Sequence, residues 1–211
     1  MMSDHLSLKD ALYPITSPAG AYYAVSSPDQ DAARVLLTHI LRLGHAVPLT
    51  TELLAEWHDN NLERGLETLY RLQRLDFVHG TTEPRPTLAV NLESQLPTLL
   101  AALSDTGRAL LADDNGLYYA TAGFHHESAE EIAALAGDIM SLNRRHGLLL
   151  KNNLNIHSLA WAVSNPAGHS ELGFFPLHVG QQSFVLVIGG TPQLQDEHFV
   201  TLIELLSRRY A

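Results

Sequence analysis

Twelve histidines make metal binding the first chemistry to consider, because imidazole nitrogens bind Zn²⁺ and other transition metals. His125, His126 and Glu127 are adjacent, whereas an H-E-x-x-H motif places its two histidines four residues apart on one helix face. His157 and His178 lie in predicted strands and could converge only if those strands pair. A metal site needs several ligands placed together, and the chain has no cysteine. We therefore predict loop or core histidines, no metal and no other cofactor.

A nucleophilic serine is the second chemistry that the sequence suggests. Ser170 lies in the segment GHSELG, which nearly matches the G-x-S-x-G nucleophile elbow of hydrolases. The elbow needs a glycine where Leu172 stands, and a helix where a strand is predicted. The sequence has no G-x-x-x-x-G-K-[ST] motif for a nucleotide phosphate, and Gly189-Gly190 lacks the lysine. We predict no enzymatic activity.

Composition bounds the remaining possibilities. The chain has 211 residues and a mass of 23.2 kDa, which predicts one or two domains. It has no secretory signal and no run of about 18 apolar residues, so we predict a soluble cytoplasmic protein without a membrane partner. The formal charge of −10 gives no general attraction for nucleic acid or anionic lipid, although a local basic patch could override it.

The second half of the sequence predicts a mixed fold. Asn115-Gly116 indicates a two-residue hairpin turn, and Ser128 with Glu131 forms a potential capping box. The predicted helices cover 93–104, 129–145 and a last helix opened by Thr191-Pro192, and the predicted strands cover 108–113, 117–122, 155–164, 172–179 and 183–188. Along the central helix, large apolar residues follow at helical spacing beside a smaller face: Ile132, Leu135, Ile139 and Leu142, then Ala133, Gly137 and Met140.

This order of elements resembles the roadblock/LC7 family, the roadblock-type dynein light chain domains. The resemblance rests on the hairpin DDNGLYYATAG, the helix AEEIAALAGDIMSLNRR, and the strands and helix that follow. It covers about residues 93–211 and implies an α+β, profilin-like fold: a five-stranded antiparallel sheet with one helix on one face and two on the other. It also implies a non-catalytic homodimer, because roadblock domains typically pair through the central helix and the edge strand after it.

Two interpretations of Ala133 and Gly137 follow from their four-residue spacing on one helix face. They pack against their own sheet, or they allow the helix of a second copy to approach closely. The resemblance favours the second interpretation. The predicted dimer interface then consists of Ala133, Gly137, Met140, Arg144, Leu159 and Trp161.

The first half predicts a winged-helix-like domain over residues 28–92, after a partly disordered N-terminal segment of residues 1–27. Ala21–Val25 could form a short strand in that segment. Three helices are predicted, from Asp29 to Leu43, after Thr50 or Thr51, and after Asn60 or Asn61. A strand at Phe77–His79 and a return strand at Thr87–Leu92 would complete the wing.

The third helix of this half carries a candidate contact surface of Arg64, Arg71 and Arg74. These arginines could meet phosphates of DNA, but Glu63 and Glu67 would repel them. Residues 1–92 hold 7 Lys and Arg against 11 Asp and Glu, a formal charge of −4, whereas DNA readers usually show a basic surface. A protein-binding or structural role is therefore favoured over DNA contact.

Together these observations predict a non-catalytic homodimeric regulatory or scaffold protein. The resemblance implies a small Ras-like GTPase as its partner, because bacterial and eukaryotic relatives commonly bind such proteins. The alternative is a transcription regulator whose winged helix contacts DNA and whose roadblock-like part dimerises. A third hypothesis is a ligand sensor with an apolar cavity between sheet and helix.

Overall fold

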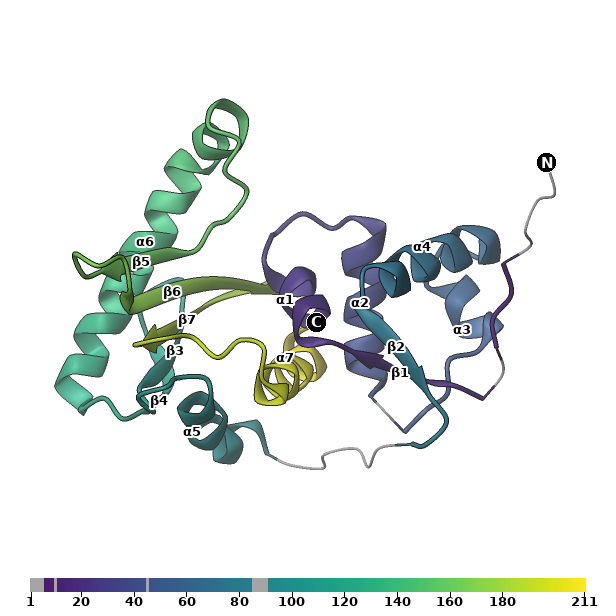
Figure 1. Cartoon of the computed structure of the whole chain (residues 1–211), viewed down its shortest axis with the longest axis horizontal. Coiled ribbons are helices and arrows are strands. Elements are labelled where there is room, and N and C mark those ends of the chain that lie inside the picture. The colour runs from purple at the N-terminus through teal and green to yellow at the C-terminus, as the bar shows by residue number, and fades with distance from the viewer. Residues whose placement is uncertain (1–5, 10, 45, 85–90) are drawn as a thin grey trace. The chain divides into compact units, whose positions relative to one another are not determined.

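The computed structural model describes residues 6–9, 11–44, 46–84 and 91–211. The chain divides into two compact units (Figure 1). The first comprises Met1–Ala24 and Asp29–Ala89, and the second comprises Val25–Pro28 and Val90–Ala211. Each unit has its own buried apolar side chains.

Helices dominate the described part of the first unit. Its elements are β1 (Tyr13–Thr16), α1 (Pro18–Val25), α2 (Ala32–Leu43), α3 (Thr51–Glu56), α4 (Leu62–Arg74) and β2 (Val78–Thr81). Side-chain caps begin three of the helices: Asp31, Thr50 and Asn61 each accept a hydrogen bond from the backbone N–H three residues later. The three predicted helices are confirmed, although the first begins at Ala32 and not at Asp29. Their inward faces bury Leu36, Leu37, Leu54, Leu69 and Leu72.

Two predictions for the strands of this unit need correction. Ala21–Val25 is helical within α1, because Ala21 and Ala24 are buried at helical spacing. Leu92 begins a helix, and residues 87–90 of the predicted return strand lie outside the described residues. The partner of β2 is β1, with Tyr13 opposite Thr81 and Thr16 opposite Val78. The winged helix therefore stays a prediction.

A five-stranded antiparallel sheet forms the centre of the second unit. Its elements are α5 (Leu92–Ala102), β3 (Ala109–Asp113), β4 (Tyr118–Ala122), α6 (His126–Asn153), β5 (Trp161–Ser164), β6 (Ser170–Val179), β7 (Gln182–Gly189) and α7 (Glu197–Tyr210). The strand order is β4-β3-β7-β6-β5, so β4 and β5 are the two edges. The predicted five-stranded antiparallel sheet is confirmed.

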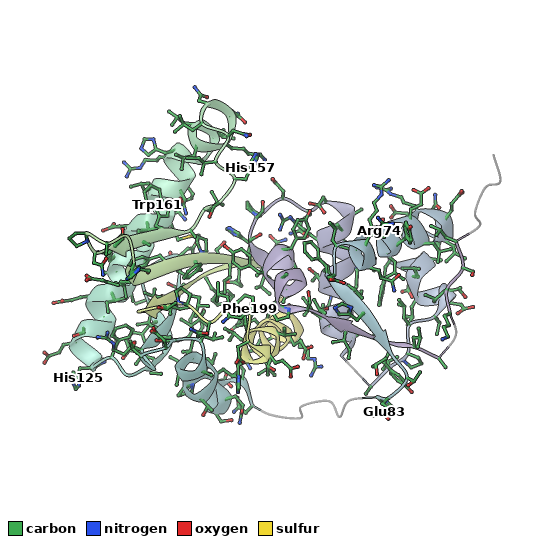
Figure 2. The ribbon with its side chains drawn as sticks, in the orientation of Figure 1. Arg74, Glu83, His125, His157, Trp161 and Phe199 are labelled. Carbon is green, nitrogen blue, oxygen red and sulfur yellow. The ribbon has the colours of Figure 1, made fainter. Side chains whose placement is uncertain are left out.

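Alternation along the central strands creates two apolar faces. On one face Leu110, Val185 and Val187 pack with the inward side of α6. The residues between them point to the other face, where the ring of Phe184 lies 5.2 Å from that of Tyr210 in α7. The buried Phe199 of α7 lies on that side, and α5 packs there too (Figure 2). One helix thus covers one face and two helices cover the other, as predicted.

The turn between β3 and β4 differs from the two-residue turn predicted. Asp113 N–H donates to Leu117 O at 2.8 Å and Gly116 N–H to Asp113 O at 3.3 Å, so three residues form the loop. Gly116 has φ +86°, a left-handed conformation that glycine adopts without strain. The Asp113 carboxylate accepts from the N–H groups of Asn115 and Leu117, both at 2.9 Å. These two hydrogen bonds stabilise the three-residue loop over a two-residue turn.

The bounds of two helices also differ from the prediction. α6 begins at His126, so Ser128 lies inside its first turn and does not cap it, and α6 continues through Gly147 to Asn153. One glycine costs a helix only about 1 kcal/mol, and the leucines and lysine after it are good helix formers. α7 begins at Glu197, where Asp196 caps it by accepting from His198 N–H.

Candidate interaction surface

Three of the residues predicted for a dimer interface lie against the sheet of their own chain. Ala133 has an exposed fraction of 0% and Met140 one of 4%, and both belong to the core with Leu110. A Cβ atom on Gly137 would lie 3.2 Å from the backbone nitrogen of Gly116. The close approach that the sequence assigned to a second copy is thus made by the β3–β4 loop.

Arg144 contacts the same loop from the next part of α6. Its guanidinium lies 3.4 Å from Asp114 Oδ2 and donates to Ser141 Oγ at 2.9 Å. About half of the Arg144 side chain is exposed, so solvent screens this ion pair and weakens it. Arg144 therefore remains accessible at the surface, unlike Ala133 and Met140.

Leu159 and Trp161 are held to α6 by Asn143, a residue that the sequence analysis did not select. The indole Nε1–H of Trp161 donates to Asn143 Oδ1 at 2.6 Å, and Asn143 Nδ2 donates to Leu159 O at 2.9 Å. Asn143 is 8% exposed, and buried polar groups of this kind stabilise only when paired. Figure 2 shows Trp161 beside α6. The signal was present, because Asn143 continues the inward spacing from Ala133, Ala136 and Met140.

The packing of α6 places small side chains inside and large ones outside. Its buried stripe consists of Ala129, Ala133, Ala136, Met140 and Asn143. Ile132, Ile139 and Leu142 are only half-buried, and Leu135 is 43% exposed. A helix that packs only on its own sheet normally buries its largest apolar stripe. The outward aliphatic side chains of α6 therefore form an apolar surface that packing within one chain leaves partly exposed.

Beyond the sheet, α6 extends several residues further and the chain then returns to β5 (Figure 1). His157 lies on this return (Figure 2), where Ile156 N–H donates to Leu150 O at 2.9 Å. Large exposed side chains concentrate here: Leu148, Leu149, Leu154 and Ile156, with Leu148 73% exposed. Contiguous exposed apolar residues mark interaction sites.

The strand β5 continues this surface to the edge of the sheet. Among the described strands it pairs with β6 alone, and its sequence WAVS has neither charge nor proline, the usual protections of an exposed edge. Val163 is 51% exposed. Residues 155–160 of the predicted strand are not in a strand, because the chain there follows α6 back to the sheet. The outward face of α6, the return segment and β5 together form the candidate interaction surface.

Two of the described histidines, His126 and His178, each lie near a hydroxyl group. Tyr118 OH and His126 Nδ1 are 2.6 Å apart, and His178 Nδ1 lies 3.1 Å from Ser183 Oγ. Within the described residues, no three His, Cys, Asp or Glu side chains come together as a metal site would require. Ser170 begins strand β6 and is followed by strand, not helix. Its position is therefore not that of a nucleophile elbow.

The three arginines of α4 all lie on its solvent side. Arg64, Arg71 and Arg74 are exposed, and Arg74 Nη1 donates to Tyr70 OH at 3.4 Å (Figure 2). Glu63 and Glu67 are exposed on the same helix. The surface is therefore mixed in charge, as the sequence predicts.

None of the helices over the described residues combines the length and apolar content that a bilayer crossing requires. No protein-family model matches the sequence, and no curated protein matches it.

Two solved structures are similar to this chain. One is the crystal structure of a roadblock/LC7 domain from Streptomyces avermitilis, with 20% identity and a TM-score of 0.39, covering 55% of this chain and 93% of the other. The second is Myxococcus xanthus MglB, with 13% identity and a TM-score of 0.36, covering 59% of this chain and 93% of the other. The second unit has the element order that the sequence predicts, a helix, two strands, a helix, three strands and a helix, around one antiparallel sheet.

Proposed function

We propose that the chain is a non-catalytic homodimer that binds a protein partner, and that α6 and β5 form its dimer interface. The carrying observation is the packing of α6, where alanines are buried and Leu135, Ile139 and Leu142 point partly outward. Burying apolar surface is worth about 25 cal/mol per Å². A second copy would remove these side chains from water.

The edge of the sheet supports the same pairing. β5 lacks charge and proline, and Asn143 holds Leu159 and Trp161 in a fixed position on α6. A fixed, uncharged edge can pair with an identical edge through backbone hydrogen bonds. In this proposal Leu159 and Trp161 position the edge, Arg144 lies at the rim, and Ala133, Gly137 and Met140 support α6 from inside.

The proposed partner is a small Ras-like GTPase, and the support is the roadblock resemblance of the second unit. Binding would act through surface complementarity and would leave the chemistry to the partner. The exposed surface of α4, with Arg64, Arg71 and Arg74, is a second place where an acidic protein could bind. Arginine and tyrosine are enriched among residues that dominate binding energy, and Tyr70 adjoins Arg74.

The alternative is DNA binding by the first unit. The three exposed arginines of α4 favour it, and Glu63 and Glu67 on the same helix oppose it. The formal charge of −4 over residues 1–92 also opposes it. We therefore place protein binding first.

Dimerisation is tested by light scattering and sedimentation of the full chain. Leu135→Lys combined with Val163→Lys should convert dimer to monomer, because it places charges in the proposed apolar interface. Leu117→Lys is the matched control, since Leu117 is 68% exposed in the β3–β4 loop, outside that interface. A wild-type chain that is monomeric at all accessible concentrations would refute the homodimer.

The partner is tested by titrating purified small GTPases from the same source organism, loaded with GDP or a non-hydrolysable GTP analogue. We expect binding that depends on the nucleotide and is lost in the monomeric variant. If the intact dimer binds these GTPases neither with GDP nor with the GTP analogue, this part of the proposal is refuted.

A further inference from the structure

The first unit contains a small apolar pocket. Its walls come from the residues before β1, from β1 itself, from the residue two positions before α3, from α4 and from β2. Three of the lining residues are buried and form its floor: Leu49, Leu69 and Val78. Leu8 and Leu12 are half-buried and form a side wall. The pocket thus reaches from the core of the first unit to its surface.

The side wall of the pocket is fixed by contacts within the unit. Leu49 N–H donates to Leu12 O at 2.9 Å. A Cβ atom on Gly80 would lie 2.9 Å from Leu12 Cδ1, so the glycine lets Leu12 lie directly against β2. Gly80 is also paired with Pro14 across the β1–β2 ribbon. A pocket whose walls are already held in place loses little freedom when it is filled.

The size of the pocket limits what it can hold. The centre of a water-sized sphere can occupy about 30 Å³ of it. Pockets that hold whole small molecules measure roughly 300–1,000 Å³. This pocket therefore suits the end of one side chain. Because its floor is apolar, a branched aliphatic group such as that of leucine, isoleucine or valine fits it best.

The mouth of the pocket is polar and basic. Gln73 of α4 and His79 of β2 line it, and both are exposed, so their side chains can bond to a peptide backbone. Lys9 directly follows the lining residue Leu8, and Arg74 directly follows Gln73. Both cations are exposed, and Figure 2 shows Arg74 on α4. Positive charges thus flank the pocket on two segments.

The charges of α4 are divided along the helix. Glu67 and Glu63 precede Arg74 by 7 and 11 residues, or about two and three turns. The last turn carries Arg71 and Arg74, against the single exposed carboxylate of Asp76 that follows. In a chain with a formal charge of −10, this end of α4 is locally basic. A surface of this kind is complementary to an acidic partner.

We propose that the pocket receives a branched aliphatic side chain from an acidic segment of a protein partner. This inference rests on the proposed protein binding at the surface of α4 and adds the anchor of that contact. Carboxylates on either side of the aliphatic residue would contact Arg74 and Lys9, while Gln73 and His79 bond to the backbone of the segment. An apolar anchor in a pocket supplies most of the affinity of such contacts, and the surrounding charges supply selectivity and a fast association.

Peptide display on the immobilised full-length chain tests the proposal. A library of random peptides should yield sequences in which leucine, isoleucine or valine stands between aspartates or glutamates. A selected peptide is then synthesised with a fluorophore, and its dissociation constant is measured by anisotropy. Replacing the central aliphatic residue of the peptide with glycine should raise this constant by about tenfold or more.

Two pairs of protein variants locate the contact. Leu8→Phe should fill the pocket and weaken peptide binding by about tenfold or more, whereas Leu6→Phe, on the same segment but outside the pocket lining, should not. Arg74→Glu should weaken binding and reduce its dependence on salt, because salt screens exposed charges. Arg64→Glu makes the same change of charge at the beginning of α4 and should have little effect. Circular dichroism confirms that each variant folds.

The outcomes separate the pocket from the wider proposal. Selected peptides without an aliphatic residue, or peptides that tolerate both Leu8→Phe and their own central glycine, would overturn the pocket. If such peptides still require Arg74, acidic binding at α4 stands without its anchor. A selection that yields no binding peptide, or peptides indifferent to Arg74→Glu, would overturn both.

Discussion

Gly137 of α6 and Gly116 of the β3–β4 loop lie so close that a Cβ on Gly137 would be 3.2 Å from the backbone nitrogen of Gly116. The reverse also holds, since a Cβ on Gly116 would lie 3.1 Å from Ala134 Cα. Each glycine lets the other segment approach, and together they fix α6 along the hairpin. A substitution at Gly137 therefore tests the fold of one chain and not the contact between two.

Gly137→Leu should lower the free energy of unfolding by about 1–3 kcal/mol, because the new side chain overpacks against backbone atoms that cannot move aside. Chemical denaturation of the full chain measures this change. Gly147→Leu is the matched control on the same helix, since a Cβ there would meet only Leu159 Cδ2 at an ordinary 3.8 Å. Equal stability of both variants would contradict the close contact.

Asn143→Leu should loosen β5 from α6. The substitution leaves Trp161 Nε1–H and Leu159 O without their partner, and an unpaired buried polar group costs about 1–3 kcal/mol. In a Trp57→Phe background, the fluorescence of Trp161 should shift to longer wavelength as the indole gains water. A double-mutant cycle with Trp161→Phe should give a coupling energy well above zero, and additive effects would show that the 2.6 Å hydrogen bond adds nothing.

Hydrogen exchange should reveal whether the C-terminal end of α6, Arg144–Asn153, is stabilised by a second copy of the chain. Amides of Arg144–Asn153 should exchange slowly when the protein is concentrated enough to dimerise and quickly when it is dilute, because the residues of this part of α6 are exposed or half-buried within one chain. The buried strand β7 should not change. Slow exchange of both regions at every concentration would mean that this end of α6 is stable within a single chain.

Acid should destabilise the second unit partly through Asp105. Hydrogen bonds from Thr191, including its backbone N–H at 2.8 Å, lower the pKa of the Asp105 carboxyl below its ordinary value. Stability from this group is therefore present above the pKa of the unfolded chain, about 3.9, and is lost as the pH falls through the lower folded value. Asp105→Asn should flatten the loss of stability below about pH 4. Glu83→Gln, in the other unit, controls for total charge.

The central strands β3 and β7 of the second unit could be predicted because their patterns are strong and local. Residues 109–113 and 182–189 are nearly continuous apolar runs, and such runs bounded by turn residues predict buried strands. The ends of α6 could not be predicted in this way. Ser128 looked like a cap, but the helix begins earlier, where His126 contacts Tyr118 of β4, a neighbour that only the folded chain brings near.

The inward and outward faces of α6 were also beyond the sequence. The large stripe of Ile132, Leu135, Ile139 and Leu142 is the better candidate for a core by size, yet the alanine stripe is buried. Small side chains let α6 lie close to the sheet. Which stripe of α6 is buried therefore depends on the shape of the sheet surface that the helix packs against. Helical spacing indicates an inward position for Asn143, but it does not reveal the partners of its side chain, which come from residues 16 and 18 positions later.

Neither the first unit nor the dimer should bind DNA tightly. The exposed face of α4 mixes Arg64, Arg71 and Arg74 with Glu63 and Glu67, and carboxylates near phosphates oppose the release of counterions that drives such binding. Titration of the full chain with genomic fragments at about 0.05 M and about 0.15 M salt should give no sequence-selective complex near 10⁻⁸ M, the usual strength of specific readers. The full chain is required because two weak contacts can add through dimerisation. Salt-sensitive, selective binding that Arg71→Ala or Arg74→Ala weakens would make the transcription regulator the better function, and its absence leaves these arginines to contact an acidic protein.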